Sequence, residues 1–139
     1  MSSQTLEQVR ARYALKQIQK HVPAPGKKPD DDTKAYATRV RSIPTMVLQN
    51  GLGQAMAFLL ADAAGDLNKP SGRLYQEIQD WLCGPRDKDW PERVYIGSSD
   101  LMQALFEGTR SEYQRAQEVS LALLAWMRKF ADAYLGKGE

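Results

Sequence analysis

The chain has 139 residues, of which 42% are hydrophobic and 26% are charged, and its formal net charge is +2. This composition excludes long intrinsic disorder as the dominant state and fits a single helical domain over residues 1–139. No run approaches the roughly 20 apolar residues that a membrane-spanning helix needs. The sequence shows no signal-peptide pattern and has one cysteine, Cys83, so we expect a cytoplasmic protein without a membrane partner.

The N-terminal part of the chain carries the excess of positive charge. Residues 1–41 hold nine Lys or Arg and four acids, whereas acids outnumber basic residues in the remainder. Such an asymmetry is compatible with a polyanionic partner. An ordinary solvated helix face would show the same pattern.

The periodic segments are rich in good helix formers, so every expected element is a helix. The capping-box pair Thr5 and Gln8 starts a helix over residues 5–21, in which Arg12, Lys16 and Lys20 form one basic ridge. A Pro- and Gly-rich loop follows. The aspartates at 30–32 are interpreted as loop and N-cap rather than as a Mg²⁺ site, before a helix over 34–42.

Pro44 is expected to end or kink that helix, because proline lacks an amide hydrogen. The most apolar helix is placed over residues 44–64 and interpreted as central and buried, with Leu48 among its core residues. Gly51 and Gly53 within it predict a close helix contact or a bend. Helices over 71–83, 100–107 and 109–135, with a polar linker at 86–97, complete a compact all-α bundle of about five to six helices.

The sequence offers no constellation for catalysis. One histidine, His21, and one cysteine cannot build a zinc site of three or four ligands. We interpret His21 as a cation near a helix C-terminus and Cys83 as a buried structural thiol. We therefore predict that the protein is not an enzyme and has no metal, cofactor or small-molecule ligand.

Two segments carry a resemblance to a known family. Residues 42–59 contain Pro44, the run Gln49-Asn50-Gly51-Leu52 and Ala57-Phe58-Leu59; residues 112–131 contain Tyr113, Glu118 and Trp126 before Arg128-Lys129-Phe130-Ala131. Both segments resemble those of the small helical subunit of the type III-B CRISPR complex, the Cmr complex. The resemblance spans nearly the whole chain.

The resemblance implies a compact helical bundle without catalytic activity. Several copies would stack as a minor filament beside the backbone subunits and line the groove in which target RNA pairs with guide RNA. They would also contact the large polymerase-like subunit. Cleavage and signalling chemistry would belong to the other subunits of this antiviral ribonucleoprotein.

Candidate RNA contacts come from the distribution of cations. Lys34 and Arg41 are expected opposite the apolar face of their helix, with Arg39 nearby, and Lys16 and Lys20 on the preceding basic ridge. Arg115 and Lys129 lie away from the apolar stripe of the last helix. Spaced cations of this kind suit recognition of an RNA backbone without base specificity.

Two other functions fit the same sequence. The chain could be a helical protein–protein adaptor whose basic faces never touch nucleic acid. It could also be a nuclease that uses the aspartate run with Mg²⁺, although no carboxylate pair favours this.

Overall fold

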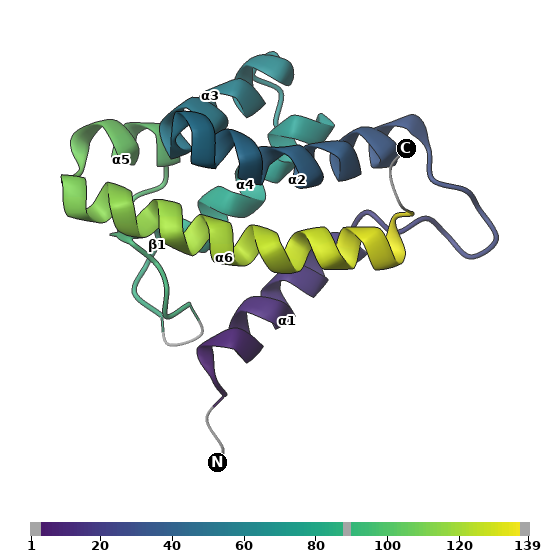
Figure 1. Ribbon diagram of the computed structural model, residues 1–139, viewed down its shortest axis with the longest axis horizontal. Helices are drawn as coiled ribbons and strands as arrows, with labels where there is room; N and C mark the ends of the chain where they lie inside the picture. The colour runs from purple at the N-terminus through teal and green to yellow at the C-terminus, as the bar shows by residue number, and fades with distance from the viewer. Residues whose placement is uncertain (1–3, 88–89, 137–139) are drawn as a thin grey trace.

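The computed structural model describes residues 4–87 and 90–136, and helices dominate it (Figure 1). The elements in chain order are α1 (Leu6–Gln19), α2 (Asp31–Asn50), α3 (Leu52–Asp62), α4 (Pro70–Leu82), β1 (Cys83–Gly84), β2 (Tyr95–Ile96), α5 (Leu101–Glu107) and α6 (Arg110–Tyr134). The predicted all-α bundle is confirmed.

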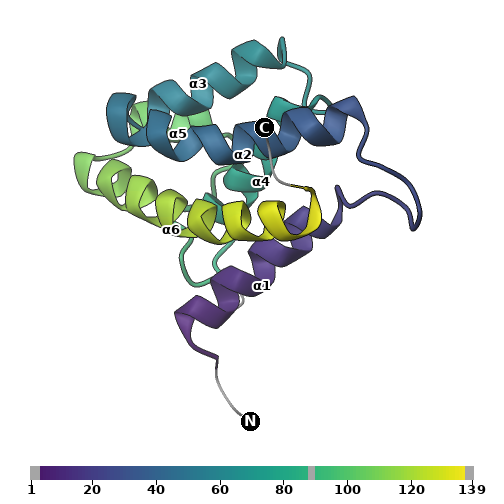
Figure 2. The same cartoon turned by 45° about the vertical axis from the view of Figure 1, so that its right-hand side comes forward.

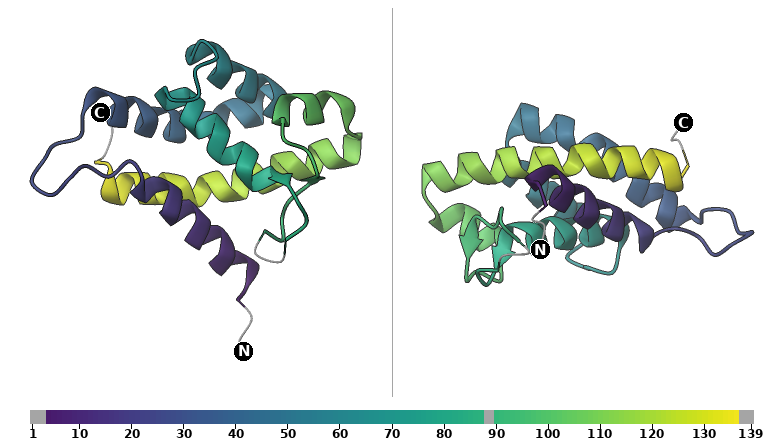
Figure 3. Two further views of the ribbon diagram at one scale, coloured as in Figure 1. Left: turned by 180° about the vertical axis from the view of Figure 1, so that it is seen from behind. Right: turned by 90° about the horizontal axis from the view of Figure 1, so that it is seen from below.

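The longest helix, α6, organises the bundle. It lies between α1 on one side and α2 on the other (Figures 1 and 2). α4 packs against α2 and α3, and α5 lies beside α3. Seen from behind in Figure 3, the segment that joins α4 to α5 lies beside α1. All six helices contribute to one continuous cluster of buried apolar side chains.

Side-chain caps fix where several helices begin. Both predicted capping boxes form, Thr5 with Gln8 and Thr109 with Glu112. Asp30 caps α2 by accepting a hydrogen bond of 2.8 Å from the amide of Thr33, which also lowers the pKa of its carboxyl. An N-cap forms within the acidic run as predicted, but it is Asp30, so α2 begins at Asp31 and not at the expected residue 34.

Pro44 does not end a helix, so the expected boundary there is wrong. α2 runs through it without interruption from Asp31 to Asn50. Val40, Ile43 and Val47 lie on both sides of Pro44 and are all fully buried. Burying such side chains contributes roughly 1.5–3 kcal/mol each, which together exceeds the penalty of about 3 kcal/mol for a proline inside a helix.

The break falls at Gly51 instead. Its backbone has φ +90° and ψ 160°, a conformation essentially restricted to glycine, and it separates α2 from α3. Gly51 has no side chain with which to cap α3, and α6 supplies the acceptors. The amide of Leu52 donates to Gln117 at 3.1 Å, and that of Gly53 donates to the Tyr113 hydroxyl at 2.8 Å. The predicted close helix contact is confirmed, with Tyr113 as the partner.

The shift of this boundary turns Leu48 outward. Its exposed fraction is 69%, so the prediction that it belongs to the core is wrong. Leu52, Met56 and Leu59 of α3 are fully buried, and Phe58 is half-buried. The core role predicted for the apolar segment therefore holds for α3.

The segment expected to be only a polar linker contains the short strand β2, which pairs in parallel with β1 at the end of α4. Cys83 pairs with Tyr95 and Gly84 with Ile96. Residues 88–89 of the expected linker lie outside the described residues. The buried carboxylate of Glu92 receives two hydrogen bonds of 2.7 Å from Arg10 of α1, which fastens this segment to the bundle.

Candidate nucleic-acid interface

The basic ridge of α1 forms as predicted. Arg12, Lys16 and Lys20 are all exposed and follow one another at intervals of four residues. On the opposite side of α1, Ala14 and Ile18 are fully buried in the core. Because four residues advance about 6 Å along a helix, the ridge offers a row of regularly spaced cations.

Two cavities meet at Lys20. The first, which we call the aromatic pocket, measures about 490 Å³ and lies between the basic ridge of α1 and the side chains of Asp80, Trp81 and Trp90. The second, the loop pocket, measures about 520 Å³ and lies where the loop after α1 meets the first turn of α2 and the start of α4.

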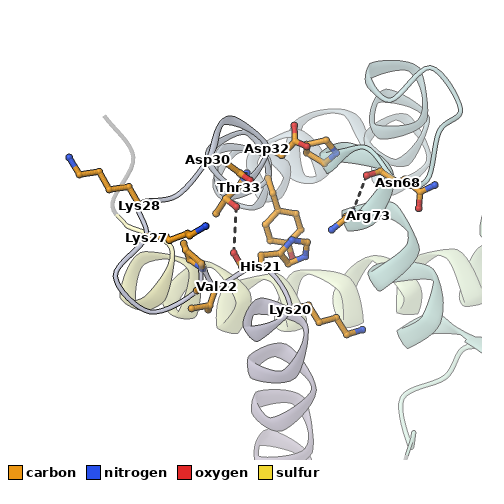
Figure 4. Close-up of a pocket in the computed structure, with 14 residues that line it drawn as sticks. Lys20, His21, Val22, Lys27, Lys28, Asp30, Asp32, Thr33, Asn68 and Arg73 are labelled. Atoms are coloured by element: carbon orange, nitrogen blue, oxygen red, sulfur yellow. Dashed lines mark hydrogen bonds between the residues drawn. The ribbon is translucent and has the colours of Figure 1, made fainter.

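The loop pocket is lined by cations from three segments, of which Lys28 extends away from the others (Figure 4). Lys27 and Lys28 come from the loop, Lys20 from the end of α1 and Arg73 from α4, while Asp30 and Asp32 also line the cavity. Arg73 is oriented by a 3.0 Å hydrogen bond to the backbone oxygen of Asn68.

The two pockets share Lys20 in their lining, and we call them together the basic groove. Six cations line it, against three carboxylates: Arg12, Lys16, Lys20, Lys27, Lys28 and Arg73, with Asp30, Asp32 and Asp80. This local excess of three positive charges is larger than the net charge of +2 on the whole chain. Such a groove suits a polyanion better than a neutral or cationic ligand.

A buried hydrogen-bond network underlies the loop pocket. Glu77 is 6% exposed, and its carboxylate accepts from the Tyr36 hydroxyl and lies 2.9 Å from His21 Nε2. The Tyr13 hydroxyl donates to the backbone oxygen of Glu77 at 2.5 Å. Burial raises the pKa of both the Tyr13 and the Tyr36 hydroxyl, and the nearby Glu77 carboxylate also raises that of Tyr36. Both tyrosines therefore remain proton donors. His21 therefore serves a specific buried contact, which the interpretation as a helix-end cation did not include.

The structure separates the seven predicted RNA contacts. Lys16 and Lys20 lie in the basic groove. Lys34, Arg115 and Lys129 are exposed but line neither pocket. Lys34 belongs to the first turn of α2, whereas Arg115 and Lys129 belong to α6, where the Lys129 ammonium lies 5.7 Å from the centre of the Trp126 ring.

Arg39 and Arg41 are both held in ion pairs within the chain, which the sequence did not indicate. Arg41 donates to Asp132 at 2.7 Å and to the backbone oxygen of Gly136, which ties α2 to the end of α6. Arg39 donates to Asp62 at 3.1 Å and lies 5.0 Å from the centre of the Phe58 ring. The expectation that Arg41 is an exposed cation is wrong: its side chain is only 17% exposed.

Sequence reasoning did not select four cations of the groove. Arg12 was visible as part of the basic ridge but was not chosen as a contact. Lys27 and Lys28 stand in the Pro- and Gly-rich loop, whose exposure was itself a usable signal. Arg73 offered no signal, because only the packing of α4 against α2 brings it to the groove.

The cysteine predicted to be structural lies in the core. Cys83 is 4% exposed and burial raises its pKa to about 11, so the structural interpretation of this thiol is confirmed. Across residues 4–87 and 90–136 there is no group of three or more His, Cys, Asp or Glu side chains that could hold a metal ion. None of the described helices has both the length and the apolar character to cross a membrane.

Two comparisons with known proteins agree on the family of this chain. The family model for Cmr5 CRISPR-associated proteins matches residues 6–134. The fold is similar to the crystal structure of a CRISPR-associated Cmr5 family protein from Thermus thermophilus, with a TM-score of 0.68 and 23% identity over 95% of this chain and 99% of that chain. The chain therefore belongs to the Cmr5 family, the small helical subunit of the type III-B Cmr system.

Proposed function

We propose that this chain is a non-catalytic structural subunit of a cytoplasmic type III-B CRISPR ribonucleoprotein that acts in antiviral defence. It works as one helical domain, residues 1–139, and stacks with further copies of itself in a minor filament. The filament lies beside the backbone subunits, contacts the large polymerase-like subunit and lines the groove for guide and target RNA. Membership of the Cmr5 family supports the assembly with other Cmr subunits.

The basic groove is the observation that carries the RNA part of this proposal. Its exposed cations come from α1, the following loop and α4, and they outnumber the carboxylates that share the groove. Cations of this kind bind phosphates without reading bases, which is what a subunit serving any guide sequence requires. Repetition along a filament multiplies a few contacts per copy through a high effective concentration.

The proposed contacts of the assembled complex are Lys16, Lys20, Lys34, Arg115 and Lys129, together with Arg12, Lys27, Lys28 and Arg73 of the groove. Arg39 and Arg41 take a lesser part, because their ion pairs with Asp62 and Asp132 already occupy them.

The test is target-RNA binding by reconstituted complexes at several salt concentrations. Lys16→Glu with Lys20→Glu removes two exposed cations of the groove, and we expect weaker binding with a flatter salt dependence. On single strands each phosphate contact contributes a slope of about −0.7, so the loss is about 1.4 for each copy that touches RNA. The matched control is Arg86→Glu with Arg110→Glu, which changes the same charge at exposed positions outside both pockets.

Equal affinity and equal salt slope for the groove variant and the wild type would remove the groove from the RNA path. If charge reversal at Lys34, Arg115 and Lys129 also left binding unchanged, the protein would act as a helical adaptor without nucleic-acid contact. Incubation of the pure chain with RNA and Mg²⁺ tests the non-catalytic role, and RNA cleavage that survives repeated purification would refute it.

A further inference from the structure

The aromatic pocket combines two kinds of side chain in separate layers. Arg12, Lys16 and Lys20 are exposed and form its outer part, whereas Tyr13 and Trp81 are buried and form its inner part. Its volume of about 490 Å³ falls within the range of about 300–1,000 Å³ that is usual for small-molecule sites. The pocket therefore has room for a ligand of the size of one nucleotide.

The inner layer is a cluster of three rings that contact one another. The ring centres of Tyr13 and Trp81 are 4.7 Å apart, those of Tyr13 and Trp90 are 5.0 Å apart, and those of Trp81 and Trp90 are 5.6 Å apart. Trp90 is the half-buried member, so it is the ring that an incoming ligand reaches first.

Trp90 is held in place by Arg93. The Arg93 guanidinium lies 4.3 Å from the centre of the Trp90 ring and donates to the backbone oxygens of Asp80, Cys83 and Pro85. Because these bonds fix the guanidinium, the ring beside it is pre-organised before any ligand arrives.

The charges around the pocket favour an anion at the outer part. Three cations face one carboxylate, Asp80, which accepts a 2.9 Å hydrogen bond from Gln76. Lys20 is directed by a 2.8 Å hydrogen bond to the Gln17 side chain, which also lines the pocket. A ligand with an anionic group and a flat ring satisfies both layers at once, and a nucleotide has this composition.

We propose that the aromatic pocket binds one unpaired nucleotide of a single-stranded RNA, with the phosphate at Lys16 and Lys20 and the base against Trp90. The proposal rests on the function proposed above and adds a preference for unpaired RNA. A base inside a duplex is stacked on both faces and cannot reach the ring, whereas an unpaired base can. An acidic peptide would engage the cations and leave the ring unused, which the test below distinguishes.

The experiment uses the indole signals of the isolated full chain in nuclear magnetic resonance spectra. The chain has three tryptophans, of which Trp81 and Trp90 line the pocket and Trp126 does not. The probes are a short oligoadenylate, a blunt-ended RNA duplex and an oligoglutamate of matched charge. We expect the oligoadenylate to shift the Trp81 and Trp90 signals with an affinity of about 10⁻⁴–10⁻⁶ M, and the other two probes to shift them much less.

Variants then separate stacking from charge. Trp90→Leu keeps every cation and is expected to weaken oligoadenylate binding about 5- to 150-fold, which corresponds to about 1–3 kcal/mol per stacked base. Trp90→Phe keeps a ring and is expected to retain most of the affinity. Trp126→Leu, which changes a half-buried tryptophan outside the pocket, is the matched control. Lys16→Ala alters only an exposed side chain, so it is expected to keep the fold and to reduce the salt slope by about 0.7.

Four results would overturn the proposed site. They are no binding of oligoadenylate, binding of oligoadenylate with unchanged Trp81 and Trp90 signals, equal shifts from oligoglutamate, and equal affinity of the wild type and Trp90→Leu. The RNA role of the assembled complex is decided separately, by the salt dependence of the reconstituted complexes.

Discussion

Glu77 is the side chain whose loss should most disturb the junction of α1, α2 and α4. The Glu77→Leu change keeps a side chain of similar volume but leaves the Tyr36 hydroxyl and the His21 ring nitrogen without their carboxylate. A buried polar group left without a partner costs roughly 1–3 kcal/mol. Two such groups give an expected loss of about 2–6 kcal/mol in the free energy of unfolding.

Thermal unfolding followed by circular dichroism measures this loss. The entropy of unfolding is about 2.1 cal/mol/K per residue, or about 290 cal/mol/K for 139 residues. The expected fall in Tm for Glu77→Leu is therefore about 7–20 °C. Glu77→Gln keeps an acceptor for Tyr36 and should fall between this variant and the wild type.

Glu118→Leu is the control, because Glu118 is exposed on α6. We expect it to change stability by no more than about 0.5 kcal/mol. If Glu77→Leu melts at the temperature of the wild type, the network does not hold α1 in place in solution, and the reasoning from buried partners is refuted.

Three further predictions concern the corrected part of the fold, each measured by denaturant unfolding. Leu52→Ala should lower the free energy of unfolding by about 2–5 kcal/mol, because Leu52 is fully buried. Leu48→Ala should lower it by no more than about 0.5 kcal/mol, because Leu48 is 69% exposed. Similar losses for the two variants would contradict the break at Gly51. Gly51→Ala should lower the free energy of unfolding by about 1–3 kcal/mol, because the φ of Gly51 is +90° and a Cβ there would lie 3.0 Å from the Tyr113 hydroxyl oxygen. A more stable variant would exclude this geometry. Arg41→Glu should lower the free energy of unfolding by about 1–3 kcal/mol, because it places a second carboxylate beside Asp132. Lys34→Glu should change stability little, because Lys34 is exposed. The reverse order would show that the ion pair between Arg41 and Asp132 is not formed.

Local signals in the sequence predicted where most helices begin. Three N-caps involve only residues within one turn of each other, so the local sequence alone can form them: Thr5 with Gln8, Asp30, and Thr109 with Glu112. The continuation of α2 through Pro44 could not be predicted from local signals. The penalty of this proline is local, but the burial of Val40, Ile43 and Val47 that outweighs it depends on packing against other helices.

The candidate site shows the same division. The ridge of Arg12, Lys16 and Lys20 follows from helical periodicity, and the sequence predicted it. Arg41 lies away from the most buried face of α2, as its position predicts. It nevertheless forms a hydrogen bond with Asp132 of α6, which is 91 residues further along the chain. The approach of Arg73 and Trp90 to the groove likewise depends on tertiary packing, which no local pattern records.

The packing of the first helix against the last has a consequence for synthesis on the ribosome. α1 leaves the ribosome first, but its chief packing partner, α6, begins only at Arg110. At about 5–20 residues per second, roughly 5–20 s pass before that partner has begun to emerge. During this time Ala14 and Ile18 have no α6 to cover them, and a chain that stops before residue 110 cannot complete the core. Folding of this subunit is therefore completed only after most of the chain has been translated, and an unfinished chain is exposed to chaperones and proteases.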